Sequence, residues 1–278
     1  MNSQAQTIFR INVRPNNHII GAYNRYFKRT NTNVVCEAPY NTDPAPLIEE
    51  MKKRNIPGAF TVAFEHDPRL LELIDVKSEM AKECDVVGFI TQKNGVITGH
   101  AQGYVGLFES IKRYLDIARK KVIIMGAGKL TRTFCYEAMR KKIPLAGIEI
   151  YNRTLQKAEE IARKYTCVTK TGPLSELTLA HGDIFMNLSD VGIAWQQGDT
   201  YSFTEDFVKQ FQLVLDPNFV PLKTQLVTTA EKVGVPVSPG YETFTEQTAY
   251  SLETMLDISI NKKILEEEFI HEFTHWNR

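Results

Sequence analysis

The segment at residues 121–142, KVIIMGAGKLTRTFCYEAMRKK, decides the fold class. The apolar stretch Val122–Met125 reads as a strand, it runs directly into Gly126–Gly128, and a helical pattern begins behind the glycines. In such a turn the first glycine permits the tight bend and the second lets the backbone approach a pyrophosphate, while the helix N-terminus offers free N–H groups. The third position of the motif is Thr131 instead of Gly or Ala. The pattern predicts a dinucleotide-binding unit; the alternative is a tight turn in an α/β domain that binds nothing.

The same alternation of strand and helix continues after this segment. Residues 145–165, LAGIEIYNRTLQKAEEIARKY, again read as strand then helix. Further strands are expected within 183–189 (DIFMNLS), 211–216 (FQLVLD) and 235–240 (VPVSPG). Alternating strands and helices imply a parallel sheet with right-handed crossovers, so the fold class is α/β.

The part of the chain before this segment reads as a second, smaller α/β unit. The expected elements are a half-buried strand at 8–13, a helix at 45–54, a strand at 57–64, one or two helices within 69–83, and two short strands within 86–99. Asn94-Gly95 between the last two strands is a strong hairpin signal. A helix at 104–120 leads into the second unit, and residues 243–273 are expected to be mostly helical.

Composition sets broad limits on function. With 278 residues, 43% of them apolar and 24% charged, the chain is long enough for two globular domains with their own cores. The formal net charge is zero, which argues against a nucleic-acid partner. No metal site is expected, because the four cysteines (Cys36, Cys84, Cys135 and Cys167) are scattered without ligand spacing; we expect reduced thiols. The N-terminal stretch lacks a signal-peptide pattern and no apolar run has membrane length, so a cytoplasmic location without membrane contact is expected.

A second cofactor signal follows the strand at 147–152. A site for NAD wants Asp or Glu at the strand end, to accept a hydrogen bond from the ribose 2′-hydroxyl. This chain has Asn152-Arg153-Thr154 there, with Lys157 one helical turn on, and Glu149 falls inside the strand. These residues suit a 2′-phosphate, which an arginine fork binds well. We therefore expect NADP(H) as the cofactor, against the alternative of a capped helix start with solvated cations.

At this point the sequence resembles the shikimate/quinate dehydrogenase family. GAGKLTR (126–132) and NRTLQKA (152–158) resemble its glycine loop and its 2′-phosphate motif, and MNLSDVG (186–192) resembles its NATxxG strand end. DPNFVPLKTQL (216–226) resembles its DxxYxPxxTxL, and GYETFTEQ (240–247) resembles its GxxMLxxQ. The order and spacing agree across most of the chain.

The resemblance implies two domains and assigns residues to each. It implies a substrate-binding domain at 1–106 with returning helices at 243–278, a Rossmann-like NADP-binding domain at 107–242, and an active site in the cleft between them. It implies hydride transfer between NADP(H) and a ring carbinol, helped by a Lys–Asp pair. The cofactor residues would be Gly126, Ala127, Gly128, Lys129, Leu130, Asn152, Arg153, Thr154, Lys157, Asn187, Leu188, Ser189 and Gly240. The substrate-binding residues would be Thr61, Gln247, Tyr241 and Phe219.

Most groups that the family uses to hold and activate shikimate are missing. When GxNVTxPxK is laid over AFTVAFEHD (59–67), Asn becomes Thr61 and the catalytic Lys becomes Asp67. In GHAQGYVG (99–106), which corresponds to GxNTDxxG, the catalytic Asp becomes Gly103. Further losses fall at Ala63, Glu65, Gly88 and Phe219, and the SxSP segment has no counterpart near residues 17–20. We infer that shikimate is not the substrate.

Two functional hypotheses remain. In the first, the site has been rebuilt: Glu65, His66 and Asp67 stand at a strand end with His100 on the facing loop, and a histidine beside a carboxylate is an acid/base pair. Such a site would protonate a carbonyl, imine or enamine as hydride is delivered. The bland interpretations are that both histidines are loop residues and that Asp67 with Pro68 only starts a helix. In the second hypothesis the protein is a non-catalytic module that binds NADP(H) or a metabolite. The retained Gln247 and the nicotinamide-side motif favour the enzyme.

Other features of the sequence give weaker evidence about function. Trp195, Tyr201, Phe203 and Phe207 suit either a flap near the nicotinamide or ordinary core packing. His271 and His275 lie one helical turn apart, but no third metal ligand is evident. The apolar positions of the last helices suit a homodimer interface, which the sequence leaves open. A small-molecule substrate is the partner that these features favour.

Overall fold

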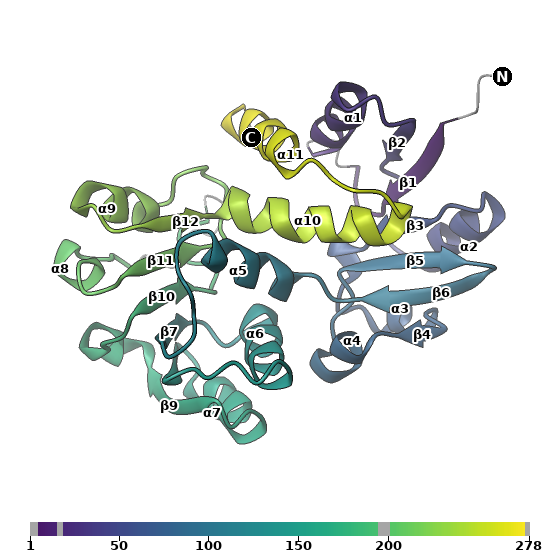
Figure 1. The fold of residues 1–278 in the computed structure, drawn as a ribbon. Helices are drawn as coiled ribbons and strands as arrows, with labels where there is room; N and C mark the ends of the chain where they lie inside the picture. Colours follow the sequence, from purple (N-terminus) through teal and green to yellow (C-terminus); the bar gives the residue numbers. More distant parts are fainter. Residues whose placement is uncertain (1–4, 16–18, 194–200, 276–278) are drawn as a thin grey trace. The chain divides into compact units, whose positions relative to one another are not determined.

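The chain folds into two compact α/β units, seen in a computed structural model that describes residues 5–15, 19–193 and 201–275. One unit comprises Met1–Gly103 with Thr245–Arg278, and the other comprises Tyr104–Phe244. Each is built on a six-stranded sheet (Figure 1). The predicted α/β fold class is confirmed, whereas the functional roles expected for the two domains stay predictions. Within the described residues, no helix is long and apolar enough to cross a membrane.

The second unit has the strand order of a Rossmann fold. Its elements are α5 (Gly103–Lys112), β7 (Lys121–Met125), α6 (Lys129–Arg140), β8 (Gly147–Asn152), α7 (Leu155–Lys164), β9 (Val168–Pro173), η2 (Leu174–Leu179), β10 (Ile184–Asn187), α8 (Glu205–Val208), β11 (Leu213–Asp216), α9 (Gln225–Val233) and β12 (Val237–Pro239). The order is β12-β11-β10-β7-β8-β9, and every neighbouring pair is parallel. The strand order reverses between β7 and β10, which is where ligands bind in sheets of this kind.

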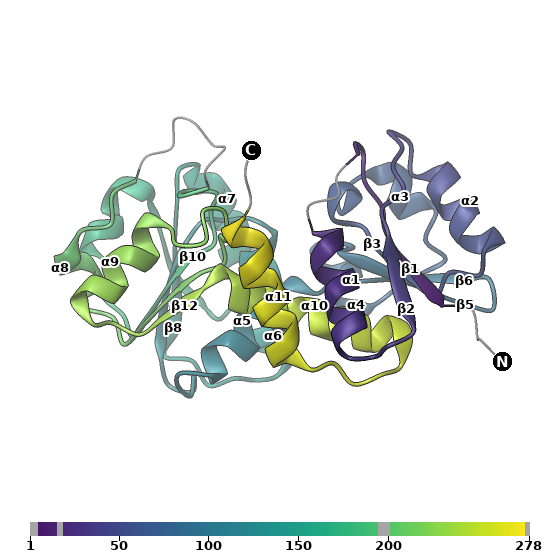
Figure 2. The same ribbon diagram turned by 90° about the horizontal axis from the view of Figure 1, so that it is seen from above.

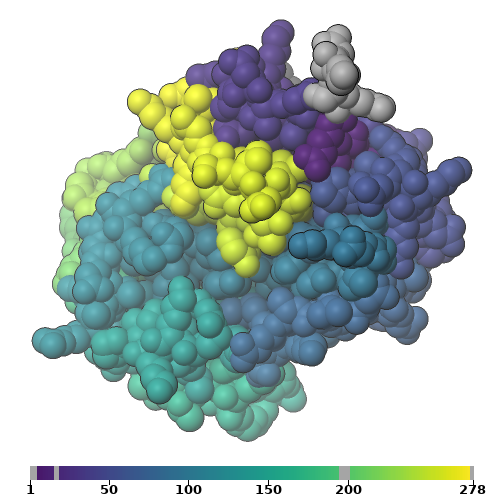
Figure 3. Space-filling view, turned by 45° about the vertical axis from the view of Figure 1, so that its right-hand side comes forward, coloured from purple at the N-terminus to yellow at the C-terminus, as the bar shows by residue number. Residues whose placement is uncertain are grey.

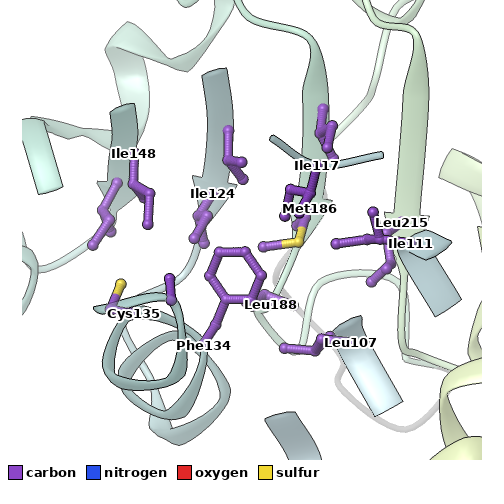
Figure 4. Packing of buried hydrophobic residues seen from close by; sticks show 14 of the residues in the cluster. Leu107, Ile111, Ile117, Ile124, Phe134, Cys135, Ile148, Met186, Leu188 and Leu215 are labelled. Atoms are coloured by element: carbon purple, nitrogen blue, oxygen red, sulfur yellow. The ribbon is translucent and has the colours of Figure 1, made fainter. Parts of the chain in front are cut away.

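Both faces of this sheet are buried under apolar side chains. On one face, residues of α5, α6 and α7 pack on the strands, with Phe134 between Ile124 and Met186 (Figure 4). On the other face, Phe185 and Tyr151 pack with residues of η2, α8 and α9. Strands covered on both sides read as continuous apolar runs, as in VIIM and LVL. This double covering holds the carboxyl ends of β7, β8 and β10 rigidly together.

The first unit has a mixed sheet. Its elements are β1 (Gln6–Arg10), α1 (Ile20–Arg29), β2 (Val34–Glu37), α2 (Ala45–Lys53), β3 (Gly58–Phe60), η1 (Val62–Phe64), α3 (Pro68–Glu72), β4 (Val76–Lys77), α4 (Glu79–Cys84), β5 (Phe89–Lys93), β6 (Val96–His100) and α11 (Lys262–Thr274). Helix α10 (Gly240–Leu256) supplies its residues from 245 onward. The strand order is β2-β1-β3-β5-β6-β4, and β5 runs antiparallel to β3 and β6. The hairpin predicted around Asn94-Gly95 is confirmed.

Helices cover both faces of the first sheet (Figures 1 and 2). Phe9, Ala59 and Ile90 pack toward α2 and α3. On the opposite face Phe60 stacks on Tyr23 of α1, with ring centroids 5.3 Å apart. The outer side of α1 meets α11, where Arg25 and Arg29 both bind the carboxylate of Glu268 at 2.6 Å, and the two helices form one continuous surface (Figure 3). The C-terminal helix is thereby fixed to the N-terminal strand–helix pair.

Three predicted elements are wrong in extent or burial. The strand at 8–13 ends at Arg10, and it is not half-buried, because Ile8 and Phe9 are both fully buried in the middle of the sheet. The strand at 57–64 stops at Phe60, since the amide of Phe64 bonds the carbonyl of Thr61 and forms a short 3-10 turn.

The helix predicted at 104–120 ends at Lys112. Beyond it the side chain of Asp116 accepts a hydrogen bond from the amide of Ala118, which offers the backbone a turn in place of further helix.

Candidate functional site

The glycine turn at the end of β7 is shaped by the neighbouring strand β10. Gly126 has φ +109°, and a Cβ atom there would lie 2.6 Å from the carbonyl oxygen of Leu188. No other residue type fits this position without moving the backbone. Thr131, in place of the third glycine, is fully buried and its hydroxyl donates to the carbonyl of Gly126 at 2.8 Å. That bond ties the first turn of α6 to the loop before it.

Gly128 behaves differently, and its surroundings test whether a dinucleotide fits. It is the N-cap of α6 with φ −94° and ψ −161°, extended values that any residue adopts. A Cβ atom at Gly128 would meet no protein atom within 4 Å, and no side chain caps the helix. Neither the backbone conformation nor protein packing requires glycine here. The space and the free N–H groups at the helix start fit a phosphate group.

The end of β8 presents polar groups and cations. Arg153, Thr154 and Lys157 are exposed at the start of α7, and the side-chain amide of Asn152 donates to the carbonyl of Thr154 at 2.8 Å. Thr154 occupies the N-cap position without a capping hydrogen bond from its side chain, which does not support the bland alternative of a capped helix start. These residues fit a phosphate better than a neutral hydroxyl.

The side chain of Glu149 is bound to other protein groups. Its carboxylate forms an ion pair with Lys121 at 2.7 Å and accepts a hydrogen bond from Tyr151 at 2.7 Å. Burial alone would raise the pKa of Glu149, but these two partners lower it overall. The carboxylate is thus held inside the strand region, as the sequence suggested.

A buried network of polar side chains lies at the ends of β10 and β11. The side chain of Asn187 donates to the carbonyl of Val191 at 2.9 Å and to Asp216 at 3.2 Å, and it accepts from the hydroxyl of Ser189 at 2.7 Å. Asn218 donates to the carbonyls of Ser189 and Val191, both at 3.1 Å. The side chain of Asn187, expected to bind the cofactor, is therefore committed inside the protein, where it fixes the loop at 188–191.

Asp216 is the acidic member of this network. It is fully buried and accepts from the hydroxyl of Thr224 at 2.6 Å and from the amide of Asn218 at 3.2 Å. Burial raises the pKa of Asp216 to about 6, although its hydrogen-bond donors oppose the rise. Sequence analysis gave Asp216 no role of its own. The signal was present in the polar run that directly follows the apolar strand LVL.

Gly240, expected to bind the cofactor, and Phe219 and Tyr241, expected to bind substrate, mainly contact other protein groups. A Cβ atom at Gly240 would lie 2.3 Å from the carbonyl oxygen of Asn218, so this glycine is required by packing. The ring of Phe219 lies 5.0 Å from that of Phe244. Tyr241 is half-buried. Of the three predicted residues, Gly240 has a structural explanation that needs no ligand.

The two residues of the first unit that were expected to bind substrate differ in how accessible their side chains are to a ligand. Thr61 is fully buried and its hydroxyl donates to the carbonyl of Val87 at 2.6 Å, so its side chain serves the fold. Gln247 is half-buried on α10, and its main-chain carbonyl accepts a hydrogen bond from the hydroxyl of Ser251 at 2.9 Å. At Gly88, one of the positions where a family group is missing, a Cβ atom would lie 3.1 Å from the side chain of Gln102. Gln102 in turn bonds Ser251.

The three predicted catalytic residues do not form a histidine–carboxylate pair with one another. Asp67 caps α3 and forms an ion pair with Arg69 at 2.6 Å, which is the bland interpretation. His66 is exposed and its Nδ1 lies 3.0 Å from the carbonyl oxygen of Asp85. His100 stacks on Phe89, with centroids 4.7 Å apart.

Of the two histidines, His100 is the less exposed. Its Nε2 lies 3.0 Å from the hydroxyl of Thr91. Burial lowers the pKa of His100, so it is neutral near pH 7.

The remaining aromatic and histidine candidates are explained by packing. Phe203 and Phe207 are buried in the core with Phe185, and Tyr201 packs on Phe203 at 4.9 Å. Trp195 lies outside the described residues. His271 and His275 sit 4.6 Å apart by ring centroids, and Nδ1 of His275 contacts the carbonyl of His271. Within residues 5–15, 19–193 and 201–275, no group of three His, Cys, Asp or Glu residues is arranged to hold a metal ion.

Comparisons with known proteins agree with this architecture. The family model for shikimate / quinate 5-dehydrogenase matches residues 109–192. A relative named shikimate dehydrogenase (NADP(+)), from Shouchella clausii, is 27% identical over 236 residues, covering 82% of this chain and 84% of that protein. The chain is thus similar to the shikimate/quinate dehydrogenase family, by the family model in the second unit and by this relative over most of its length. The resemblance read from the glycine loop and the C-terminal motifs is thereby confirmed.

Solved structures show the same fold over nearly the whole chain. A shikimate 5-dehydrogenase-like protein superimposes with a TM-score of 0.83 at 18% identity, covering 98% of this chain and 99% of that one. A 5-ketofructose reductase of Gluconobacter sp. strain CHM43 superimposes with a TM-score of 0.80 at 18% identity, with the same coverage. At this identity the likeness establishes the fold alone. The fold of these two proteins therefore extends over nearly the whole chain.

Proposed function

We propose that this protein binds NADP(H) in its second unit and transfers hydride to or from a small carbonyl, imine or hydroxyl substrate other than shikimate. The observation that carries the proposal is the open N-terminus of α6, where Gly128 leaves space that no protein atom occupies. The curated relatives support the choice of cofactor, since they are named shikimate dehydrogenase (NADP(+)). NADP(H) supplies the hydride when bound.

Each part of the second unit has a separate task in this proposal. The free N–H groups behind Gly128 orient the pyrophosphate. Arg153, Thr154 and Lys157 hold the 2′-phosphate, and Arg153 supplies a planar fork of donors. Glu149 is held by Lys121 and does not compete for the ribose, which removes the feature that favours NAD. The network around Asn187 fixes the loop at 188–191 beside the glycine turn.

The substrate side argues against shikimate. The family's catalytic lysine position is Asp67, whose carboxylate is bound to Arg69, and its catalytic aspartate position is Gly103. A charge reversal and a lost carboxylate remove the pair that handles the hydroxyl proton. The 5-ketofructose reductase is a precedent for another carbonyl substrate on this fold, an argument by analogy.

The proton that the substrate gains or loses together with hydride then needs another acid/base group. His100 is neutral and hydrogen-bonded to Thr91, which is a resting state from which an imidazole accepts a proton. His66 is exposed, with its Nδ1 beside the carbonyl oxygen of Asp85. In the proposal one of these two histidines replaces the Lys–Asp pair as acid/base.

The alternative is a non-catalytic module that binds NADP(H) or a metabolite. The observation that favours it is the role of Asp67, which caps a helix and thereby has a structural reason to differ from lysine. The two hypotheses share the cofactor and differ in turnover.

The test is an assay of the purified protein with NADPH against a panel of ketones, imines and keto acids, with NADP⁺ and shikimate in parallel. We expect oxidation of NADPH with at least one compound and no shikimate oxidation at an ordinary enzyme rate. Shikimate turnover at such a rate would make the interpretation of Asp67 and Gly103 wrong. Once a substrate is found, His66→Ala and His100→Ala decide the acid/base, since intact turnover in both variants would eliminate it.

A further inference from the structure

Arg10 ends β1 in the middle of the first unit's sheet. Side chains alternate along a strand, so Arg10 shares a face with Ile8 while Phe9 packs toward α2 and α3. Arg10 is in register with Phe60 of β3, and Phe60 stacks on Tyr23 of α1. The guanidinium therefore lies on the face of the sheet that α1 and α10 cover. The strand at 8–13 was expected to be half-buried, yet this second face of it is covered as well.

Two of the three nitrogens of the Arg10 guanidinium lack hydrogen-bond partners. Its Nε and Nη1 atoms are buried and form no hydrogen bond in the described structure. The hydroxyl of Tyr23 is near Arg10 and Thr248 and influenced by both, yet it too forms no hydrogen bond of ordinary geometry. The buried hydroxyl of Thr245, one helical turn before Thr248 on α10, is also unsatisfied. Unpartnered polar atoms thus come from a strand and two helices.

Such a cluster is unusual in a folded protein. Buried polar groups are nearly always hydrogen-bonded, and a buried cation without an anion is destabilising. The contrast lies in the same unit, where Arg25 binds both Glu268 and Glu272. Arg10 has no such carboxylate among the described residues. A residue that destabilises the unliganded fold calls for a ligand that offsets it.

We propose that Arg10 is the receptor for a carboxylate group of the protein's small-molecule ligand. A planar guanidinium matches a planar carboxylate, and the other members of the cluster, Tyr23, Thr245 and Thr248, are neutral hydroxyls. One positive charge among neutral donors suits a monoanion. Arg10 as a whole is only partly buried, so a ligand can reach it. Thr245 and Thr248 flank Gln247, the residue that the family resemblance assigns to the substrate.

The inference that this ligand is a substrate rests on the proposed function. The inference that Arg10 binds an anion does not. The substrate class becomes small carbonyl or hydroxyl compounds that carry one carboxylate. Shikimate dehydrogenase motifs supply serines before the first helix, which this chain lacks; Arg10 would provide the charge from a different element.

The test uses sodium benzoate as the probe and benzamide, its neutral isostere, in calorimetric titrations of the whole protein at fixed ionic strength. The wild type is expected to bind benzoate and not benzamide. Arg10→Gln should lose affinity for benzoate by about tenfold or more, because a charge-assisted contact is removed, and Arg10→Lys should be intermediate. Arg163→Gln, an exposed arginine on α7, serves as the matched control and should bind benzoate as the wild type does.

Three results would overturn the proposal: no benzoate binding by the wild type, equal affinity in Arg10→Gln, or binding of sodium sulfate without benzoate. Arg10→Lys keeps the charge and guards against a folding failure in Arg10→Gln, which circular dichroism monitors. An NADPH titration of the same samples separates the two proposals. Loss of NADPH binding with benzoate binding intact refutes the proposed function and leaves the anion site standing.

Discussion

Replacing Gly128 by serine tests the cofactor site with a change that should not destabilise the fold. The position has extended dihedral angles and no protein atom within 4 Å of a built Cβ. Serine is a better N-cap than glycine by a few tenths of a kcal/mol, because its hydroxyl bonds a free amide of the first turn. The variant should therefore unfold at the same temperature as the wild type or slightly higher. The same hydroxyl would occupy the space for the pyrophosphate and use one of its donors.

The expected loss follows from the bond removed. A hydrogen bond to a charged group contributes about 1.5–3 kcal/mol, so the dissociation constant for NADPH should rise by roughly ten- to a hundredfold. Nicotinamide fluorescence measures the affinity and differential scanning calorimetry measures the stability. Gly126→Ala is the contrasting variant: with φ +109° and a contact of 2.6 Å to Leu188, it should destabilise the protein by roughly 2–5 kcal/mol. Unchanged NADPH affinity in Gly128→Ser would refute the assignment of this space to a dinucleotide.

Three further variants probe separate parts of the account. Arg153→Ala should raise the dissociation constant for NADPH about tenfold and leave that for NADH unchanged in parallel titrations; equal effects on both would eliminate the 2′-phosphate assignment. Asp216 has a folded pKa of about 6 against 3.8 unfolded, so its protonation stabilises the fold fully below pH 3.8 and that contribution is lost as pH rises through 6. Urea unfolding of Asp216→Asn should lack this loss, a difference of about 2 kcal/mol between pH 4 and 7; identical pH profiles would contradict the pKa. Glu268→Gln should lower the unfolding free energy by roughly 1–2 kcal/mol, since both arginine partners are partly exposed, and an unchanged value would show that the pairing of α1 with α11 is not stabilising.

Much of the second unit could be predicted because local rules and the fold agree there. The sequence predicts a strand, a turn and a helix in order at two places, VIIM followed by GAG and EIYNRT followed by a helical pattern. The structure has these elements in both places. Gly126 is where that prediction is strongest, because its conformation and its contact with Leu188 both require glycine.

The first unit was harder to predict, because long-range packing overrides the local pattern. Periodicity assigned the strand at 8–13 one solvent face, yet it became a central strand, since helices from both ends of the chain cover it. Arg10 lies at the end of this strand, and sequence analysis gave it no role. The run of Glu65, His66 and Asp67 suggested chemistry, but the side chain of Asp67 turns back to Arg69 and the helix start. Hydrogen-bond partners between distant segments, such as Thr61 with Val87, leave no trace in spacing.

The measurement that tests the central claim most directly is a fluorescence titration of the purified protein with NADPH, with NADH run in parallel. We predict saturable binding of NADPH, and binding of NADH at least about tenfold weaker, because a 2′-phosphate held by Arg153 and Lys157 adds charge-assisted bonds. Saturation by NADPH alone would establish the cofactor half and direct the search to carboxylate-bearing carbonyl compounds. No saturable binding of either nucleotide would contradict the oxidoreductase account.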